Sequence, residues 1–575
     1  MTDFEWIVLL DGETEVSREL VGGKAKSIAD MKALGLTVPP AFAITTRACL
    51  AYQDSGDLPP GLEAEVDRAM AWLEAEMGRT FGKGDKRLLL SVRSGAAISM
   101  PGMMDTVLNL GIDDEAEASL AMETGMADFA ADTHRRFIEL YANIVLKQPV
   151  DAESGADAAA WRAELSSLGA PLPDTSREQL FGAIRAVFDS WNTRRAKRYR
   201  KHNNIPDDLG TAVTVQAMVF GNLDDRSGTG VLFSRNPLTG DKAPYGEYLP
   251  RAQGEDVVSG KFTPLPLEAM REREPEAHAE LLAASTLLET THRDVQDIEF
   301  TVQTGKLYLL QSRSAKRAPM AAMRFAVDMV DEGRIDVPTA LSRVTAEQAA
   351  AMLLPRLASG AASAEPLASG EGACPGAASG VLVADSDEAE RRAAAGEAVI
   401  LVRKTTSPDD VHGMIAARGV VTEQGGSTSH AAVVSRALGR PCVVGVGDGL
   451  VARAGESVTI DGEKGIVFAG ALATEIPRES DDPVLCKILE WLPADVRERV
   501  RAPDQAAAAG ATNVDPLLAD GDDQLSDALG GKKALCGQGL SNPDVVRAAI
   551  SAGVETFYAE PVLPVALAIH AATRT

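Results

Sequence analysis

The 575-residue sequence has few cysteines, few aromatic residues and fewer basic than acidic side chains. Its five cysteines (Cys49, Cys374, Cys442, Cys486 and Cys536) are odd in number, lie far apart and show no metal-ligand spacing. We therefore expect reduced thiols rather than a disulfide framework. The 57 basic and 83 acidic residues give a net charge of −26. This charge argues against nucleic acid or an anionic membrane as a partner, so local basic groups must bind any anionic substrate.

The sequence also begins without a long apolar run. Its first fifteen residues, MTDFEWIVLLDGETE, are acidic, and their apolar stretch of about five residues is too short for a membrane span and unlike a secretory signal. We therefore expect a cytoplasmic protein with no membrane partner. The length of the chain predicts about three or four domains.

One histidine follows a glycine turn and opens a predicted helix. In the segment VVTEQGGSTSHAAVVSR, residues 420–436, an apolar strand-like run is followed by two glycines. Thr428 and Ser429 offer hydroxyls that can cap a helix beginning at His430. Gly439 can end that helix.

The first turn of a helix is a suitable place for a phosphoryl acceptor. Free backbone N–H groups and the helix dipole favour negative charge there and oppose protonation of an imidazole ring. A neutral imidazole can receive a phosphoryl group. The sequence therefore makes His430 a candidate phosphoryl carrier, and the alternative is a surface or capping histidine.

Two basic residues beside glycines are candidates for phosphate binding. Lys24 follows Gly22 and Gly23 at a turn into a helix predicted over 26–34, although the Walker pattern is absent. Arg93 ends a buried strand, next to a loop of small residues. Arginine at such a position fits triphosphate binding. Alternatively, Lys24 is a surface lysine and Arg93 belongs to a structural ion pair.

The middle of the first 330 residues combines a strand pair with charged helices. Residues 211–221 and 231–235 are strand-like and flank a turn, which predicts a β-hairpin. Residues 110–205 have a helical, charged character, with basic runs at 134–137 and 194–198. We interpret these basic runs as a solvated face.

A second predicted hairpin brings several polar groups together. Its strands lie on either side of a turn at Thr304 and Gly305. Residues two apart on a strand share a face, so Asp297 and Glu299 point the same way, as do Gln311 and Arg313. Carboxylate and amide oxygens can hold Mg²⁺, and the guanidinium can hold nucleotide phosphates. The alternative is an exposed polar face.

Taken together, these segments resemble the pyruvate phosphate dikinase family. The resemblance is carried by GGK at 22–24, SVRSG at 91–95, SMPGMMDT at 99–106, QDIEF at 296–300, LQSR at 310–313 and GGSTSHAAVV at 425–434. It implies a phosphotransferase in which Mg-ATP phosphorylates His430. It also implies that ATP is contacted by Lys24, Arg93, Asp297, Glu299, Gln311 and Arg313. Of these residues, Asp297, Glu299 and Gln311 would also bind Mg²⁺.

Several positions depart from the family pattern. Ala97 and Gln424 stand where the family usually has arginine, and the resemblance implies that Ala97 removes one phosphate contact. Thr428 falls on the threonine that regulatory proteins phosphorylate in some members, although a helix cap is the role we favour for it.

The resemblance also divides the chain into domains of α/β and α+β class. It implies an ATP-grasp nucleotide-binding domain over 1–330 with a helical insert at about 110–205, a linker over 331–370, a swivelling phosphohistidine β/α domain over 371–470 and a short remnant of a (β/α)₈ barrel over 471–575. The last segment has 105 residues, whereas such a barrel needs roughly 200. We therefore expect the middle of the barrel to be deleted.

The segment LCGQGLSNP at 535–543 resembles the part of the family barrel that carries a catalytic acid, here Cys536. Gln538 and Gly539 replace the glutamate and histidine of the family, and a small buried cysteine is the alternative. In the family, phosphate is a second acceptor and pyruvate becomes phosphoenolpyruvate. Here a separate acceptor subunit or a homodimer is an open possibility. A second hypothesis is a non-catalytic nucleotide-binding partner of a full-length dikinase.

Overall fold

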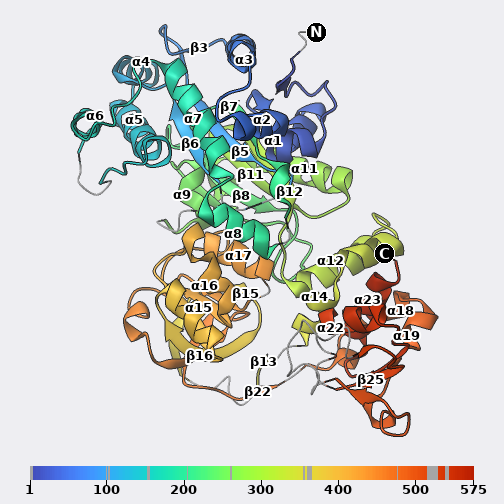
Figure 1. Cartoon of the computed structure of the whole chain (residues 1–575). Coiled ribbons are helices and arrows are strands. Elements are labelled where there is room, and N and C mark those ends of the chain that lie inside the picture. The colour runs from blue at the N-terminus through green and yellow to red at the C-terminus, as the bar shows by residue number, and fades with distance from the viewer. Residues whose placement is uncertain are drawn as a thin grey trace.

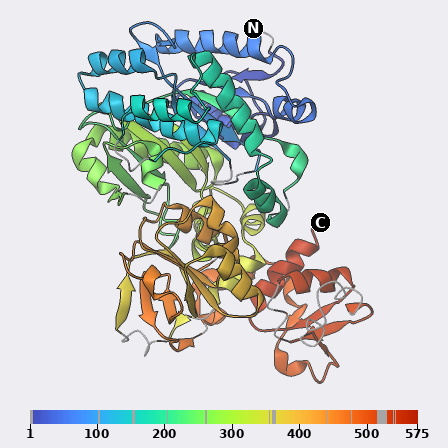
Figure 2. The same ribbon diagram turned by 60° about the vertical axis from the view of Figure 1, so that its left-hand side comes forward.

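The computed structural model describes residues 4–98, 100, 104–151, 156–203, 205–258, 262–353, 356–358, 365–438, 440–475, 477–514, 529–537, 540 and 543–574. These residues form three bodies (Figures 1 and 2). The first body spans residues 4–314, the second spans 366–469, and the third combines 319–353 with 477–574. In both views the second body lies below the first and the third lies beside the second. Within the described ranges, no helix is long and apolar enough to cross a membrane.

The first body contains two five-stranded sheets. One has the strand order β1-β2-β7-β5-β6 and the other β10-β9-β8-β11-β12. Their strands are β1 (Ile7–Leu9), β2 (Ala41–Ile44), β5 (Leu90–Gly95), β6 (Thr106–Leu110), β7 (Ala212–Ala217), β8 (Gly228–Phe233), β9 (Tyr245–Pro250), β10 (Leu265–Pro266), β11 (Gln296–Gln303) and β12 (Lys306–Ser314), with a separate short pair β3 (Thr80–Phe81) and β4 (Arg87–Leu88).

The hairpin predicted from residues 211–235 is wrong. β7 pairs with β2 and β5 in the first sheet, whereas β8 pairs with β9 and β11 in the second. Both strands are buried at every position, which is the pattern of a central strand covered on both faces. The turn between them therefore carries the chain from one sheet to the other.

Helices cover these sheets and form an insert of their own. The α-helices of the first body are α1 (Arg18–Ala33), α2 (Thr46–Ser55), α3 (Leu62–Met77), α4 (Asp114–Thr124), α5 (Ala127–Tyr141), α6 (Ala158–Ser167), α7 (Ser176–Ser190), α8 (Arg194–His202), α9 (Gly254–Val258), α10 (Glu268–Arg273) and α11 (Pro275–His292). The basic runs on α5 and α8 are not simply a solvated face, because Arg136 donates to Asp256 at 2.8 Å and Arg195 pairs with Asp105.

In its described residues, the second body consists of an eight-stranded sheet with three α-helices. Its strand order is β14-β21-β20-β16-β17-β18-β19-β15. The elements are β14 (Pro366–Ser369), β15 (Glu371–Cys374), β16 (Ala377–Val383), α15 (Ser386–Ala394), β17 (Val399–Arg403), α16 (Val411–Ala416), β18 (Gly419–Thr422), α17 (His430–Leu438), β19 (Cys442–Val444), β20 (Ser457–Asp461) and β21 (Ile466–Ala469). Strands β16 to β19 are parallel to one another, so α17 is the crossover between β18 and β19.

The third body joins the C-terminal segment to three helices that precede the second body. Its elements are α12 (Pro319–Asp331), α13 (Val337–Arg343), α14 (Ala346–Met352), α18 (Pro483–Trp491), α19 (Ala494–Arg497), β23 (Val500–Arg501), β24 (Thr512–Asn513), β25 (Ala534–Cys536), α22 (Pro543–Ser551), β26 (Thr556–Tyr558) and α23 (Val562–Ala572). The four strands among its described residues run parallel in the order β23-β26-β25-β24.

One apolar core holds the third body together. Phe325 of α12 and Leu341 of α13 belong to the same buried cluster as Ile488, Phe557 and Leu567. The segment predicted as a linker therefore begins with packed helices, while most of its alanine- and serine-rich run, residues 359–364, lies outside the described residues. Two short strands, β13 (Arg356–Leu357) and β22 (Thr474–Glu475), pair where the chain enters and leaves the second body.

Candidate active site

A cavity of about 1800 Å³ lies at the junction of the first body with α14 and α17. Its lining includes every nucleotide-contact candidate from the sequence, Lys24, Arg93, Asp297, Glu299, Gln311 and Arg313, together with His430. These residues come from α1, β5, β11, β12 and α17. The fold thus brings together groups that are up to about 400 positions apart in the sequence.

The hairpin of β11 and β12 supplies four of these side chains. Asp297 pairs in register with Arg313, and Glu299 with Gln311. The intervening Ile298 is completely buried in an apolar cluster, so alternation along the strand leaves the polar groups on the cavity side. The predicted turn is present, with positive φ at Thr304 and Gly305.

Two ion pairs fix this polar face. Arg313 Nε donates to Asp297 Oδ2 at 2.8 Å, and Arg93 Nη2 donates to Glu299 Oε2 at 3.1 Å. Burial raises the pKa of Asp297. Burial also acts to raise the pKa of Glu299, but the charges of Arg93 and Arg313 outweigh it and lower that pKa. Arg93 is therefore both an ion-pair partner and part of the cavity wall.

Two acceptor atoms in the cavity are left for a ligand. Asp297 Oδ1 and Gln311 Oε1 are buried and have no hydrogen-bond partner among the described residues. Buried acceptors without a partner are rare, because each one loses its hydration. Carboxylate and amide oxygens are the ligands that Mg²⁺ prefers, so this donor set fits a magnesium ion.

A kinked helix places Lys24 beside these groups. The backbone of α1 is non-helical at Gly22, where φ is 77°. A Cβ atom at Gly22 would lie 1.9 Å from the carbonyl oxygen of Gly95, so only glycine allows the helix to approach β5 this closely. Burial and the nearby charge of Arg93 lower the pKa of Lys24 to about 7.

His430 is the first residue of α17, and only one of its two ring nitrogens has a hydrogen-bond partner among the described residues. Its Nδ1 is hydrogen bonded to Thr406 Oγ1 at 3.1 Å. Its Nε2 is buried and has no partner in the part of the chain that the structure describes. Burial lowers the pKa of the ring to about 4 and outweighs the opposing charge of Asp410. The imidazole is therefore neutral near pH 7.

The loop before His430 is bound to the first body. Glu247 on β9 accepts hydrogen bonds from Ser427 Oγ at 2.8 Å, from Ser427 N at 3.2 Å and from Thr428 Oγ1. Burial raises the pKa of Glu247. The hydroxyl of Tyr245, on the same strand, lies 2.7 Å from both Ser427 Oγ and Glu371 Oε1, the two acceptors for its single proton.

These contacts correct the predicted helix caps. The hydroxyl of Thr428 donates a hydrogen bond to Glu247 Oε2. Ser429 Oγ is buried and has no partner among the residues that are described. The favoured capping role of Thr428 is therefore wrong. Its hydroxyl instead bonds a carboxylate on another body that sequence spacing could not indicate. Gly439, the predicted helix end, lies outside the described residues.

Three functional candidates were missed by sequence reasoning. Glu255 on α9 lines the cavity, and burial and Asp256 raise its pKa to about 7. Glu247 comes from a position without a local motif, and Arg436 ends the segment 420–436 without a spacing that marks it as a ligand. A basic or acidic residue on a helix or strand carries no signal until its neighbours from distant segments are known.

The remaining sequence candidates lie in different places. Ala97 lines the cavity, so the position where the family usually has arginine is in the site. Gln424 does not line it. Cys536 ends β25 in the third body as a half-buried free thiol. Gln538 and Gly539 lie outside the described residues.

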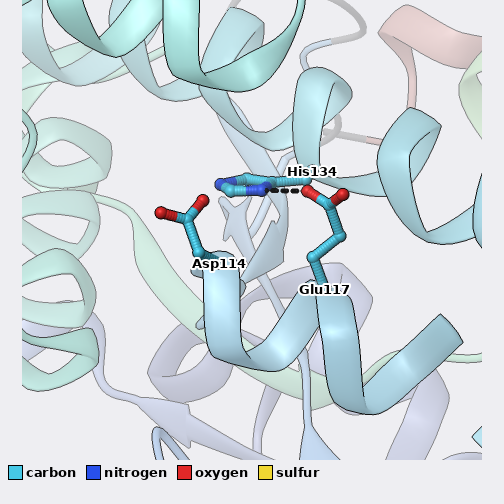
Figure 3. Close-up of side chains that lie close together, drawn as sticks. All are labelled: Asp114, Glu117 and His134. Carbon is cyan, nitrogen blue, oxygen red and sulfur yellow. Dashed lines mark hydrogen bonds and ion pairs between the residues drawn. The ribbon is translucent and has the colours of Figure 1, made fainter. Parts of the chain in front are cut away.

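A separate cluster of one histidine and two carboxylates, His134, Glu117 and Asp114, occurs in the helical insert (Figure 3). His134 on α5 is almost fully buried, and its Nδ1 lies 2.7 Å from Glu117 Oε2 on α4. Asp114 lies near the same ring but forms an ion pair with Arg162. These residues do not line the cavity. Their contacts join α4, α5 and α6, which is a structural role.

Comparison with known proteins matches two segments, each of which contributes residues to this site. Residues 53–274 match the pyruvate phosphate dikinase AMP/ATP-binding domain, and residues 395–465 match the mobile domain of phosphoenolpyruvate-utilising enzymes. The first segment contains Arg93, Glu247 and Glu255, and the second contains His430.

Curated relatives extend the match over most of the chain. The chain is 44% identical over 536 residues to pyruvate, phosphate dikinase 2 of Zea mays, with 86% of this chain and 60% of the relative covered. It is 43% identical to the pyruvate, phosphate dikinase of Rhizobium meliloti (85% and 60% covered) and 41% identical to that of Clostridium symbiosum (82% and 58% covered). The chain thus spans about 60% of the length of these relatives, and by these matches it belongs to the pyruvate phosphate dikinase family.

Proposed function

We propose that this protein is an ATP-dependent phosphotransferase of the pyruvate, phosphate dikinase type, in which Mg-ATP phosphorylates His430. One observation carries the proposal. His430 Nε2 is buried and has no partner among the described residues. His430 lines the same cavity as Lys24, Arg93 and Asp297. A nucleophile and a phosphate-binding set therefore face one space.

The reaction follows from the state of the imidazole ring. Since its pKa is about 4, the ring is neutral. In the tautomer that carries its proton on Nδ1, this nitrogen donates to Thr406 Oγ1 and the lone pair is on Nε2. This lone pair attacks a nucleotide phosphorus in line. An N–P bond forms, the P–O bond to the departing phosphate breaks, and the bonding electrons leave with that oxygen. Lys24 and Arg93 stabilise the charge that develops there.

The metal is assigned to the unpartnered oxygens of β11 and β12. Asp297, Glu299 and Gln311 would hold Mg²⁺, which neutralises phosphate charge when it is bound. Arg313 orients Asp297 through its 2.8 Å hydrogen bond. The two sheets around this site are the basis for proposing an ATP-grasp domain over residues 1–330.

The second body is proposed to be the swivelling phosphohistidine domain, residues 371–470. The pairing of β13 with β22 supports this assignment. These strands lie where the chain enters and leaves the second body, so both connections to that body are at one place. A body connected at one place can rotate about that place. The connection between 331 and 370 would then be the linker, with its rigid part in α13 and α14.

The fate of the phosphoryl group is the second part of the proposal. Residues 471–575 form a parallel sheet of four strands in the described residues, half the number of a (β/α)₈ barrel, and we interpret them as a barrel remnant. Cys536, at the end of β25, is the candidate acid. The proposed acceptors are phosphate and pyruvate, which would become phosphoenolpyruvate. The acceptor site would lie on this chain, in a homodimer or on a separate acceptor subunit, and the proposed compartment is the cytoplasm.

The small third body favours one alternative function. A chain that binds nucleotide but has no acceptor site would act as a nucleotide-binding or regulatory partner of a full-length dikinase. The two functions differ in whether His430 is phosphorylated and whether the phosphoryl group then leaves.

The proposal is tested by incubating the protein with Mg²⁺ and ATP labelled at the β- or γ-phosphorus. We expect acid-labile, base-stable label on the wild type, none on His430→Ala, and strongly reduced label on Asp297→Asn. Absence of label on the wild type, or equal label on His430→Ala, would contradict it. A chase with unlabelled pyruvate then shows whether the label leaves the protein, which separates the complete dikinase from the regulatory partner.

A further inference from the structure

Arg436 on α17 is a buried cation with unused hydrogen-bond donors. Its side chain is 3% exposed, and it lines the cavity on the same helix as His430. Its Nη1 donates to the carbonyl oxygen of Ala373 at 3.2 Å, while Nε and Nη2 are buried without a partner within the described ranges. A guanidinium cannot shed its charge, so an arrangement of this kind is costly unless an anion binds to it.

The position of Arg436 points to where that anion lies. Its guanidinium carbon is 6.0 Å from the ring centroid of Phe233. Phe233 is the register partner of Asp297 across β8 and β11. Asp297 is the carboxylate whose Oδ1 lacks a partner among the described residues, because Arg313 bonds only its Oδ2. Arg436 and Asp297 are therefore neighbours across the boundary between the second and first bodies.

The two groups nevertheless do not satisfy each other. In the described part of the chain, Asp297 forms an ion pair with Arg313 and none with Arg436. A carboxylate oxygen that lacks a cation thus stands near a guanidinium that lacks an anion. A metal ion together with a phosphate oxygen satisfies both, since the carboxylate binds the metal and the guanidinium binds the phosphate.

We propose that Arg436 binds a phosphate oxygen of the metal-bound nucleotide, so that the histidine-bearing body supplies one of the phosphate ligands itself. This inference rests on the proposed function. The nucleotide site is then complete only when the second body contacts the first. By linkage, nucleotide binding and contact between the bodies strengthen each other. Release of the phosphate chain removes this contribution and favours departure of the second body.

The experiment compares the affinity of nucleotides for the wild type and for variants of the full chain, measured by titration calorimetry. Arg436→Gln is expected to weaken binding of Mg-ATP by roughly 10- to 100-fold, the effect of losing charge-assisted hydrogen bonds. Arg436→Lys is expected to lose less, because the charge is kept. Binding of AMP is expected to stay unchanged, because AMP lacks the phosphates that a metal ion bridges.

Arg440→Gln is the matched control. Arg440 lies just beyond α17, donates to the carbonyl oxygen of Ile415 at 3.2 Å and does not line the cavity. It should bind both nucleotides as the wild type does. If Arg436 had a purely structural role, both Arg436 variants would melt at a lower temperature. They would also bind AMP and Mg-ATP more weakly, and to the same extent. That result, or unchanged Mg-ATP affinity in Arg436→Gln, would overturn the inference.

The inference and the proposed function can fail separately. Selective loss of Mg-ATP affinity in Arg436→Gln supports the inference even if the wild type gives no label on His430. Label on His430 with unchanged affinity in Arg436→Gln supports the function and contradicts the inference. A wild type that does not bind Mg-ATP contradicts both.

Discussion

At the scale of single residues, the site depends on ionisable groups that burial has moved from their ordinary pKa values. Burial lowers the pKa of His430 to about 4, which leaves the ring neutral and nucleophilic near pH 7. Burial and Arg93 lower the pKa of Lys24 to about 7, so its ammonium is only partly charged at that pH. A buried lysine of this kind gains most from a phosphate, because a bound anion restores its charge.

Lys24 therefore predicts how nucleotide binding depends on pH. Because its pKa is lowered, the group is charged below about 7 and becomes neutral as the pH rises through that value. Mg-ATP affinity of the wild type should then fall above pH 7, by about ten-fold per pH unit where binding requires the ammonium. In Lys24→Arg the decline should be much smaller, since arginine stays charged.

Calorimetric titrations at pH 6, 7 and 8.5 check this prediction. Glu255, whose pKa is raised to about 7 mainly by burial, also adds negative charge over this range, so Glu255→Gln in the Lys24→Arg background is the control. Parallel pH profiles for the wild type and Lys24→Arg would rule out Lys24 as the source of the decline.

At the scale of elements, β9 and the loop before α17 hold His430 in place. Glu247 receives three hydrogen bonds from Ser427 and Thr428. A Cβ atom at Gly426 would lie 2.8 Å from Glu247 Oε1, so a side chain there would displace the carboxylate from these hydrogen bonds. Loss of the carboxylate would leave buried hydroxyl and N–H donors with a poorer acceptor.

We expect Glu247→Gln to slow phosphorylation of His430 by at least about ten-fold, because charged hydrogen bonds between the two bodies are weakened. Mg-ATP affinity should fall as well, because nucleotide binding and contact between the bodies strengthen each other, so the rates are compared at saturating Mg-ATP. Rapid-quench measurements of label formation at saturating Mg-ATP test this, with the exposed Glu268→Gln on α10 as a matched control. An unchanged rate in Glu247→Gln would show that this contact does not position the histidine.

The elements also show what the sequence could and could not predict. The alternation of Asp297 and Glu299 along one strand, before a tight turn, is a local signal, and the structure places both in the cavity with Gln311 and Arg313. The hairpin predicted from residues 211–235 failed because both strands found partners from distant segments. Glu247 was not predicted because it meets Ser427 across 180 positions of the chain.

At the scale of the whole molecule, three bodies meet around one cavity. The second body faces the first through His430 and Arg436, and α14 of the third body also contributes to the lining. α12, α13 and α14 share an apolar core with the C-terminal strands and helices. The first and third bodies are therefore the proposed fixed parts between which the second body moves, and the paired β13 and β22 mark the place of rotation.

The central claim is that the nucleotide in this cavity phosphorylates His430 on the nitrogen that faces it. Phosphorus NMR of the protein after incubation with Mg-ATP, with His430→Asn as control, tests this most directly, because it distinguishes the two phosphohistidine isomers. Nδ1 is hydrogen bonded to Thr406, whereas Nε2 has no partner among the described residues. We therefore predict a single phosphohistidine resonance, from phosphate on Nε2, that is absent in His430→Asn. Phosphate on Nδ1, on another residue or nowhere on the protein would contradict the account.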